Sequence, residues 1–370
     1  MQRAEVVLGA LRKRAESRPD MVFLRLYRHL YNPDLYVKTK TSTRDIQKVI
    51  ALLRTESYYP GRTPGCQCDA LVEHALAQLI AAVFGLDLGS PDDRQGRALA
   101  LRALSKAAGV RWALVGNLEG TLGEMDTHML ARVLGTRIQD GRVLELSRRI
   151  FQTRGWRGSL GAVFRQLCLE RFDRLARGHR EIVAYARWGT SFMAVGKERL
   201  DGLHEAVSGF LQTHLVPGAG AAQLRLVDMA WERPVFLGYQ LAAGPGGCRL
   251  LVPAQVLKER LWGFVRENRS IHRPDRVGLG VERIVGLYRQ ELVQLFRDYA
   301  LAHDGQRQLS RFRHYHFGSL LKTLARKEQA SARAVMEKYR VVQEGKSTIG
   351  VRVATGLVVY PVVAPGCISS

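Results

Sequence analysis

Residues Tyr185–Gly196 read YARWGTSFMAVG, and they place the first constraint on the fold. Apolar and aromatic residues stand on both sides of the polar triplet Gly189-Thr190-Ser191. Two such runs joined by a short glycine-containing turn are typical of an antiparallel β-hairpin. The triplet offers two hydroxyl groups and no carboxylate, so its side chains are poor ligands for a divalent metal ion. The sequence therefore predicts a hairpin whose turn does not hold a metal.

The chain is strongly basic. Its 370 residues include 56 Lys and Arg against 34 Asp and Glu, which gives a net charge of +22 and a pI near 10.3. Such a surplus favours a polyanionic partner, because each neutralised phosphate releases condensed counterions. Most of the cations are Arg, which suits bidentate phosphate contacts and stacking on bases. We therefore expect RNA, DNA or an anionic membrane surface as the partner. The alternative, that the chain is basic only for solubility, is disfavoured by the size of the surplus.

Length and hydropathy indicate a folded chain of two or three domains, with 46% hydrophobic residues. The longest apolar run, residues 79–89, is far shorter than the roughly 18–20 residues that cross a membrane, so we expect a core helix there. Residues 1–20 are rich in Arg but contain acidic residues too, which is atypical of a matrix-targeting presequence.

The cysteine count is odd, and it predicts no disulfide framework and a reducing compartment. The cysteines are Cys66, Cys68, Cys168, Cys248 and Cys367. Cys66, Cys68 and His74 do not form a convincing zinc site, because a closed site needs four ligands and the usual spacing is C-x2–4-C. His314 and His316 lack acidic or Cys neighbours, so we expect RNA-facing or core histidines and no metal ligand.

Periodicity and turn signals predict a mixed α+β chain. Helices are expected in 1–57, with a break at Asn32-Pro33-Asp34, and a strand is expected over Trp112–Leu118. Residues 283–340 are predicted to be almost wholly helical, and a hairpin is expected around Ala354-Thr355-Gly356. The expected segments are 1–68, 69–245, 246–282, 283–345 and 346–370.

Several motifs carry a resemblance to a known family. WALVGNLEGTLGEMDTHMLARVLGTRIQDGRVLELSRRIF (112–151) resembles the first catalytic strand and following helices of group II intron reverse transcriptases. VAYARWGTSFMAVG (183–196) resembles their Tyr-Ala-Asp-Asp hairpin, and FLGYQL (236–241) their Phe-Leu-Gly strand. Residues 287–340 resemble their maturase domain X, with SLLKTLARK (Ser319–Lys327) as the most specific block, and LYRHLYNPDLY (26–36) resembles their opening helices.

The resemblance covers roughly residues 20–340 and implies a reverse-transcriptase-like fold. It implies an N-terminal helical, reduced fingers region in 1–68 and a degenerate palm in 69–245. A linker with a helix would occupy 246–282, an all-helical thumb or maturase domain 283–345, and a short β-hairpin tail 346–370.

The resemblance also implies that polymerase chemistry has been lost. The family holds two metal ions with carboxylates, and the matching positions here are Asn117, Thr190 and Ser191. A neutral amide and two hydroxyl groups cannot balance two divalent ions. We therefore expect no catalytic residue, no metal site and no cofactor, with Mg²⁺ implied only if polymerase activity survives.

Other positions depart from the family in the same direction. Glu119 stands where the family has Lys, and Gly123 where it has Asp. Glu119, Glu124 or Asp126 are the available substitutes for the missing carboxylates, but we do not expect them to restore catalysis. The segments around 58–66 and 155–163 are shortened relative to the family.

The maturase-like half supplies the predicted RNA contacts. The resemblance, the charge and the interleaved aromatic residues together favour RNA over a bland solvated surface. The spacings of four and seven residues between Lys322, Arg326 and Arg333 predict that these three cations lie on one helical side. The expected core residues are Leu320, Leu321, Leu324, Val335 and Met336. The expected RNA-binding residues are Arg311, Arg313, Lys322, Arg326, Lys327 and Arg333.

The resemblance implies an RNA-binding protein without polymerase activity that assists RNA folding or group II intron splicing. Two alternatives stay open: an active RNA-directed DNA polymerase with unorthodox metal ligation, and a structural component of an organellar ribonucleoprotein such as the mitochondrial ribosome. The expected partner is structured RNA, from a group II intron or a ribosome, with possible ribonucleoprotein partners and no membrane. The family's distribution favours a mitochondrion, with an organelle-encoded gene possible, over a chloroplast. Residues 341–370 leave no room for an endonuclease domain.

Overall fold

The computed structural model divides the chain into two compact units. Unit 1 comprises Met1–Ala100 and Ala113–Leu226, and unit 2 comprises Leu101–Trp112 and Val227–Ser370. The described residues are mainly helical and carry small sheets, which confirms the predicted α+β class. The structure describes residues 3–37, 42–61, 68–86, 93–119, 127–155, 158–214, 224–354 and 356–362.

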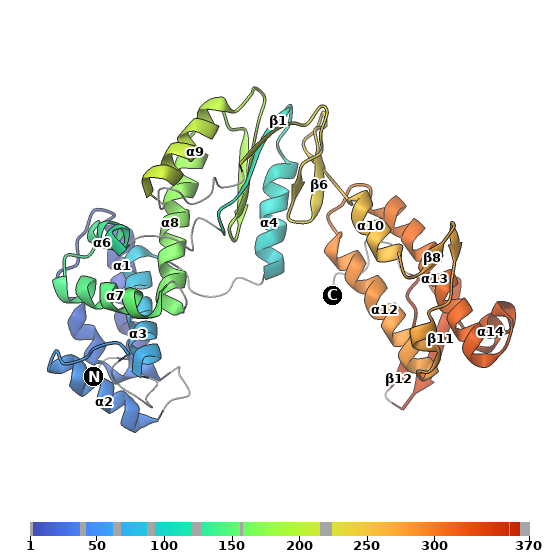
Figure 1. Ribbon diagram of the computed structural model, residues 1–370, viewed down its shortest axis with the longest axis horizontal. Helices are drawn as coiled ribbons and strands as arrows, with labels where there is room; N and C mark the ends of the chain where they lie inside the picture. Colours follow the sequence, from blue (N-terminus) through green and yellow to red (C-terminus); the bar gives the residue numbers. More distant parts are fainter. Residues whose placement is uncertain are drawn as a thin grey trace. The chain divides into compact units, whose positions relative to one another are not determined.

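The helices of unit 1 gather around one apolar helix, α3 (Cys68–Phe84) (Figure 1). Its sequence is apolar at nearly every position, so it needs neighbours on all sides. Helices α1, α2, α7 and α8 provide them. The core helix expected in 79–89 is confirmed as far as Phe84. The surrounding helices are α1 (Ala4–Ser17), α2 (Thr43–Arg54), α6 (Thr127–Gly135), α7 (Gly141–Arg154) and α8 (Ser159–Arg177).

The expected break at Asn32-Pro33-Asp34 lies between two short 3-10 helices, η1 (Tyr27–Tyr31) and η2 (Pro33–Tyr36). The Asn32 side chain accepts the Asp34 backbone N–H at 3.1 Å, and the fixed φ of Pro33 suits the first turn. This segment was expected to contain longer helices. The chain instead folds tightly because buried Tyr36 donates its hydroxyl to the Leu30 carbonyl at 2.7 Å.

A four-stranded sheet, in the order β2-β3-β1-β4, holds the predicted hairpin. The strands are β1 (Trp112–Asn117), β2 (Ala184–Trp188), β3 (Ser191–Gly196) and β4 (Arg225–Asp228). Trp188 pairs with Ser191, which leaves a two-residue turn of Gly189 and Thr190. Gly189 has a φ of +59°, which glycine adopts without cost. The hairpin and the strand expected from Trp112 are both confirmed.

Aromatic packing joins this sheet to α8 and α9 (Asp201–His214). The Phe172 ring of α8 meets the fully buried Phe192 ring of β3 edge to face, with 4.8 Å between their centroids. Phe172 also contacts Phe210 of α9. Gly116 of β1 leaves the space that Phe192 occupies, because a Cβ atom there would lie 2.4 Å from the Phe192 Cε1 atom. Gly116 is therefore a packing requirement of the sheet.

We expect Gly116→Ala to destabilise unit 1. The added methyl group meets a buried ring that cannot turn away, and overpacking of this kind costs about 1–3 kcal/mol. Gly209→Ala is the matched control, because nothing lies within 4 Å of a Cβ atom at that position of α9. The control should gain roughly 0.5–1 kcal/mol from the removal of a mid-helix glycine. Thermal unfolding of the two variants measures both effects, and equal stability of the variants would contradict this packing.

Unit 2 continues with a three-stranded sheet in the order β5-β6-β7 and then with helices (Figure 1). Tyr239 of β6 donates its hydroxyl to the Asp298 carbonyl at 2.7 Å, which attaches this sheet to α12. The sheet strands are β5 (Val235–Phe236), β6 (Tyr239–Ala242) and β7 (Arg249–Leu251). The elements that follow are α10 (Ala254–Leu261), β8 (Val265–Arg266), β9 (Arg269–Ser270), α11 (Pro274–Val277), α12 (Val281–Asp298), α13 (Gly305–Glu328) and α14 (Ala332–Lys338).

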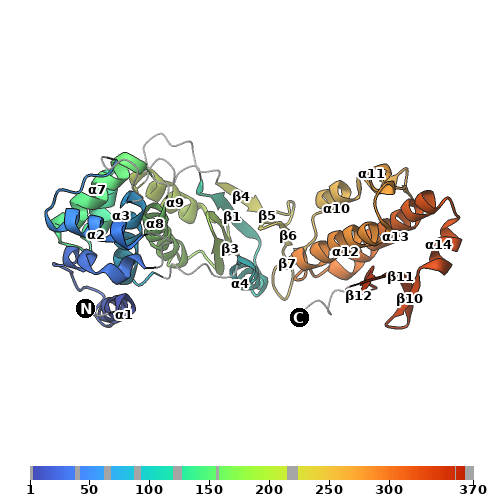
Figure 2. The same cartoon turned by 90° about the horizontal axis from the view of Figure 1, so that it is seen from below.

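Helices α12 and α13 pack side by side along much of their length (Figure 2). The chain then forms a sheet of β10 (Arg340–Gln343), β11 (Lys346–Val353) and β12 (Gly356–Val359), whose β11 and β12 contact α12. The predicted C-terminal hairpin is confirmed by the pairing of Val353 with Gly356. Strand β10 was not expected. It makes the tail an integral part of the helical unit.

Two further findings concern the cysteines and the helix lengths. Cys68 is disulfide-bonded, a single bond that the prediction of no disulfide framework did not include. Cys168 and Cys248 are free and buried. Over the part of the chain that the structure describes, no helix combines the length and apolar character needed to cross a membrane.

Candidate nucleic-acid interface

The structure places Asn117, Thr190 and Ser191 close together, where β1 ends and the β2–β3 hairpin turns. Asn117 is the last residue of β1, and the next residue, Leu118, donates its N–H to the Thr190 carbonyl at 2.9 Å. Thr190 is in the hairpin turn and Ser191 begins β3. Asn117, Thr190 and Ser191 are thus neighbours in the fold, and they offer an amide and two hydroxyl groups.

The donor set at this edge does not fit two divalent metal ions. Asn117 Oδ1 accepts the Glu119 N–H at 3.0 Å, and the Thr190 carbonyl is used by Leu118. Gly123, Glu124 and Asp126 lie outside the described residues. Within those residues, no group of three or more His, Cys, Asp or Glu side chains could hold a metal ion. We derive no metal-dependent step at this site.

A buried carboxylate, Asp173 of α8, fixes the hairpin from one side. Arg187 of β2 donates from Nε to Oδ1 at 2.7 Å and from Nη2 to Oδ2 at 2.9 Å. Tyr185 donates its hydroxyl to Oδ1 at 2.6 Å, and Arg187 Nη1 also donates to the Gly189 carbonyl at 2.7 Å. A buried ion pair whose atoms are also hydrogen-bonded keeps its side chains in one arrangement, and here it fixes the hairpin against α8. No sequence pattern indicates this pairing, because Asp173 lies in a helix that precedes the hairpin.

Unit 2 presents the predicted cations on the exposed side of α13. Arg311, Lys322 and Arg326 are all exposed. Their separations of eleven and four residues correspond to about three turns and one turn, so they lie along one side of the helix. The opposite side is buried, and it carries Leu309, Phe312, His316, Leu320 and Leu324. This side of α13 is therefore a row of cations backed by the core.

The other three predicted cations lie elsewhere. Half-buried Arg313 donates to the Val362 carbonyl at 2.6 Å, so it holds the C-terminal tail. Lys327 points to the Val277 carbonyl of α11 at 3.4 Å. Arg333 belongs to α14 and pairs with Glu337 at 3.3 Å. The expectation that Arg333 shares a helical side with Lys322 and Arg326 is wrong, because α13 ends at Glu328.

The helix break has a local cause. Gln329 adopts the left-handed conformation, with a φ of +50°, and it ends α13. Ser331 then caps α14 by accepting the Ala334 N–H at 3.1 Å. Sequence periodicity across 322–333 could not predict this break between α13 and α14, because Gln is not a usual residue at a left-handed helix end. The core prediction holds for Leu320, Leu324 and Val335, while Leu321 and Met336 are only half-buried.

A second set of cations, which sequence reasoning missed, lies beside this side of α13. It comes from α10 and the β8–β9 hairpin, and it comprises Lys258, Arg266 and Arg269. The hairpin is attached to α13 because Ser270 Oγ donates to the Tyr315 carbonyl at 2.9 Å. Lys322 Nζ also donates to the Ser270 carbonyl at 2.7 Å. We call Lys258, Arg266, Arg269, Arg311, Lys322 and Arg326 the basic face.

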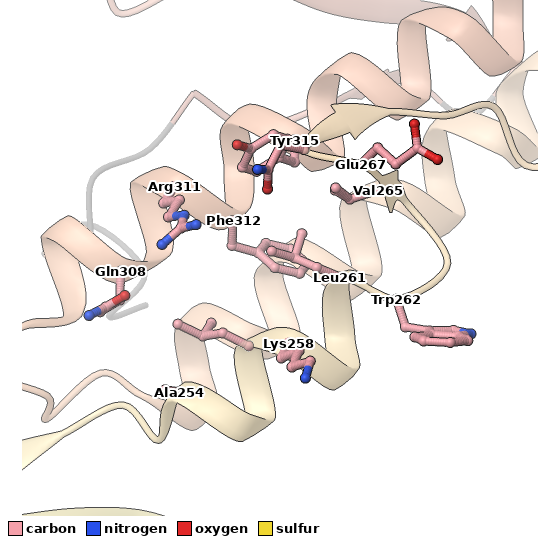
Figure 3. Close-up of a pocket in the computed structure, with 12 residues that line it drawn as sticks. Ala254, Lys258, Leu261, Trp262, Val265, Glu267, Gln308, Arg311, Phe312 and Tyr315 are labelled. Carbon is pink, nitrogen blue, oxygen red and sulfur yellow. The ribbon is translucent and has the colours of Figure 1, made fainter.

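A groove of about 530 Å³ lies between α10, the β8–β9 hairpin and α13, and it is lined in part by the basic face (Figure 3). Its floor is apolar and includes Leu257, Leu261 and Phe312. Its rim carries Lys258 and Arg311. An apolar groove of this size with a few polar groups at the rim has the usual character of a binding site.

A buried polar cluster supports α13 from beneath. Arg276 of α11 donates from Nη1 to Glu291 Oε2 of α12 at 2.9 Å. The same Oε2 atom accepts from His316 Nε2 at 3.2 Å, and His316 Nδ1 lies 3.1 Å from the Tyr360 hydroxyl. Because a carboxylate can only accept, Nε2 carries the proton and Nδ1 accepts from Tyr360. One cluster therefore joins α11, α12, α13 and the tail.

The environment sets the protonation states of this cluster. Burial by itself raises the pKa of Glu291, but the hydrogen bonds from His316 and Arg276 outweigh it and bring the pKa down to about 2. Burial lowers the pKa of His316, and the neighbouring Glu291 carboxylate only partly opposes this. The cluster at neutral pH is thus an ion pair beside a neutral imidazole.

The comparisons with known proteins add nothing to this geometry. No model of a known protein family matches the chain, and no curated protein matches it. The description of the site rests on the arrangement of its own residues.

We expect His316 to make the stability of unit 2 depend on pH. Its pKa in the folded state lies below the usual 6.5. Between these two values the unfolded chain binds more protons, so stability falls as the pH drops below 6.5. Thermal unfolding of His316→Gln between pH 7 and pH 5 should show a smaller loss than the wild type. The control is His314→Gln, which changes an exposed residue two positions away and should keep the wild-type slope. Equal slopes in both variants would contradict the assignment.

Proposed function

We propose that this chain is an RNA-binding protein of the group II intron reverse transcriptase/maturase type, without polymerase activity, and that it assists RNA folding or intron splicing. The observation that carries the proposal is the basic face of unit 2. Its cations come from α10, the β8–β9 hairpin and α13, and the hydrogen bonds of Ser270 with Tyr315 and Lys322 fix the hairpin to α13. A rigid array of positive charge is suited to the phosphate backbone of a folded RNA.

The dimensions of the basic face suit a backbone partner. Residues 311–326 of α13 span about 22 Å at the helical rise of 1.5 Å per residue. The hydrogen-bond partner of Lys322 is a carbonyl oxygen, so its positive charge is left for an anion. Contacts of this kind position an RNA without reading its sequence. RNA would therefore be recognised by its shape and its phosphates, while the RNA itself performs any splicing chemistry.

The arrangement of unit 1 supports the degenerate palm that the resemblance implies. A strand ends at Asn117, two helices and α8 follow, and a hairpin then pairs back beside that strand. The metal-binding carboxylates are replaced at all three matching positions. We propose that this unit is a retained scaffold, and that the helices of unit 2 correspond to the thumb or maturase domain. Structured RNA from a mitochondrial group II intron or ribosome is the proposed partner.

Removal of the α13 cations tests the role of the basic face. We expect Arg311→Ala/Lys322→Ala/Arg326→Ala to weaken binding to a structured RNA and to reduce the slope of log K against log salt by about three, since each phosphate contact contributes about one. Binding is measured by filter retention or anisotropy from 50 to 200 mM salt.

The matched control removes the same charge from another helix of unit 2. Arg283, Arg289 and Arg297 are exposed on α12. The variant Arg283→Ala/Arg289→Ala/Arg297→Ala should lose far less of the salt dependence. An equal loss in both variants would mean that net charge, and not the basic face, determines binding.

We expect no RNA-directed DNA synthesis. Asn117, Thr190 and Ser191 cannot hold two divalent ions, and this two-metal arrangement is what activates the primer hydroxyl in nucleotidyl transfer. The measurement is primer extension on an RNA template with Mg²⁺ or Mn²⁺, with a carboxylate-bearing reverse transcriptase as the positive control. Template-dependent product above the level of heat-inactivated protein would contradict the proposal.

A further inference from the structure

We propose that the groove between α10, the β8–β9 hairpin and α13 receives one unpaired nucleobase of the bound RNA. This inference rests on the proposed RNA-binding function and adds the class of ligand that the groove takes. The groove lies wholly within unit 2. It combines an apolar interior with a charged rim.

The interior of the groove suits a flat, weakly polar ring. Phe312 of α13 is directed toward α10 and forms the floor together with Leu257 (Figure 3). Both residues are buried, so the floor is part of the core of the unit and is preformed. The volume of about 530 Å³ is within the range of small-molecule sites. A base with its ribose fits such a space, whereas a paired duplex cannot enter it.

Trp262 supplies an aromatic surface at the edge of the groove. It is the residue that ends α10, and it is 82% exposed. Figure 3 shows its indole directed outward from the end of the helix. An exposed indole beside cations is the kind of surface on which unpaired bases stack. Trp262 is therefore placed to stack on the base or on its neighbour.

The charges at the rim select an anionic ligand. Lys258 on α10 and Arg311 on α13 lie on opposite walls of the groove, where the phosphates on either side of an inserted base would pass. The acidic residue that lines the groove, Glu267, has Arg266 3.9 Å away. The rim thus has a net positive charge. An apolar peptide would gain nothing from these cations, which is why we favour a nucleotide over a protein segment.

Two amide side chains give the groove the capacity to bind a base edge. Gln308 lines the α13 wall, and Asn268 lines the turn of the β8–β9 hairpin. Each carries both a donor and an acceptor, as the edge of a nucleobase does. Glu267 and Asn268 both have positive φ, at +48° and +58°, as the two central residues of a tight hairpin turn do. The two amides therefore line the groove from the hairpin and from α13.

The experiment compares two RNA hairpins that differ by one base. One carries a single bulged adenosine, and the other carries an abasic nucleotide at the same place, so that length, phosphates and backbone flexibility are equal. Stacking of one base contributes about 1–3 kcal/mol, so we expect the full-length protein to bind the bulged adenosine at least about fivefold more tightly.

Variants assign the preference to the groove. Trp262→Ala should abolish the preference, so that this variant binds the two hairpins with equal affinity. Trp231→Ala is the matched control, because Trp231 is 89% exposed in the same unit and does not line the groove. It should keep the wild-type preference. Arg311→Ala should weaken binding to both hairpins to the same extent, as expected for a phosphate contact.

The outcomes separate this inference from the function on which it rests. If the wild type binds both hairpins tightly and equally, the groove does not receive a base, and a protein segment becomes its better occupant, while RNA binding stands. If Trp231→Ala loses the preference and Trp262→Ala keeps it, the inference is also overturned. If the wild type binds neither hairpin, the proposed function itself fails.

Discussion

The pairing of Arg276 with Glu291 is the interaction on which unit 2 depends. Arg276 is buried, and its guanidinium lies 4.6 Å from the centre of the Tyr288 ring as well as against the carboxylate. Glu291 extends the contact to His316, and His316 extends it to Tyr360. Glu291 is only half-buried, and removal of its carboxylate would leave the buried Arg276 without its ion-pair partner and destabilise the unit. Because α13 sits at the middle of this cluster, the same pairing fixes the basic face at its surface.

The two units show different relations between geometry and chemistry. In unit 1 the sheet keeps a close packing of Gly116 on Phe192 and a clamp of Asp173 on Arg187, yet the positions at its edge carry an amide and two hydroxyl groups. A hairpin can be maintained by such contacts alone, because they stabilise the fold without any metal. In unit 2 the cations occupy exposed positions on rigid elements. Under the proposed function, unit 2 would therefore bind its partner through charge, shape and stacking.

The sequence predicted what depends on local pattern. The glycine turn at Gly189 and the apolar strand from Trp112 are both predicted by short stretches of sequence. The four-residue spacing of Lys322 and Arg326 places them on one side of a single helix. It failed where tertiary contacts decide. Arg313 is drawn to the Val362 carbonyl, and the left-handed Gln329 turns Arg333 away from α13. The groove could not be predicted because Trp262 and Arg311 are far apart in the chain. They come together in the fold, where the bond of Ser270 to Tyr315 attaches the β8–β9 hairpin to α13.

The most direct test is ultraviolet crosslinking of the protein to RNA in its native extract, with both the crosslinked peptides and the attached RNA identified. The account predicts crosslinks in residues 254–270 and 305–328. Attached RNA from the stem-loops of one intron would indicate a splicing role, and attached ribosomal RNA would indicate a ribosomal role. Crosslinks confined to the hairpin of 184–196, or none above the background of unirradiated extract, would contradict the claim that unit 2 binds RNA through its basic face.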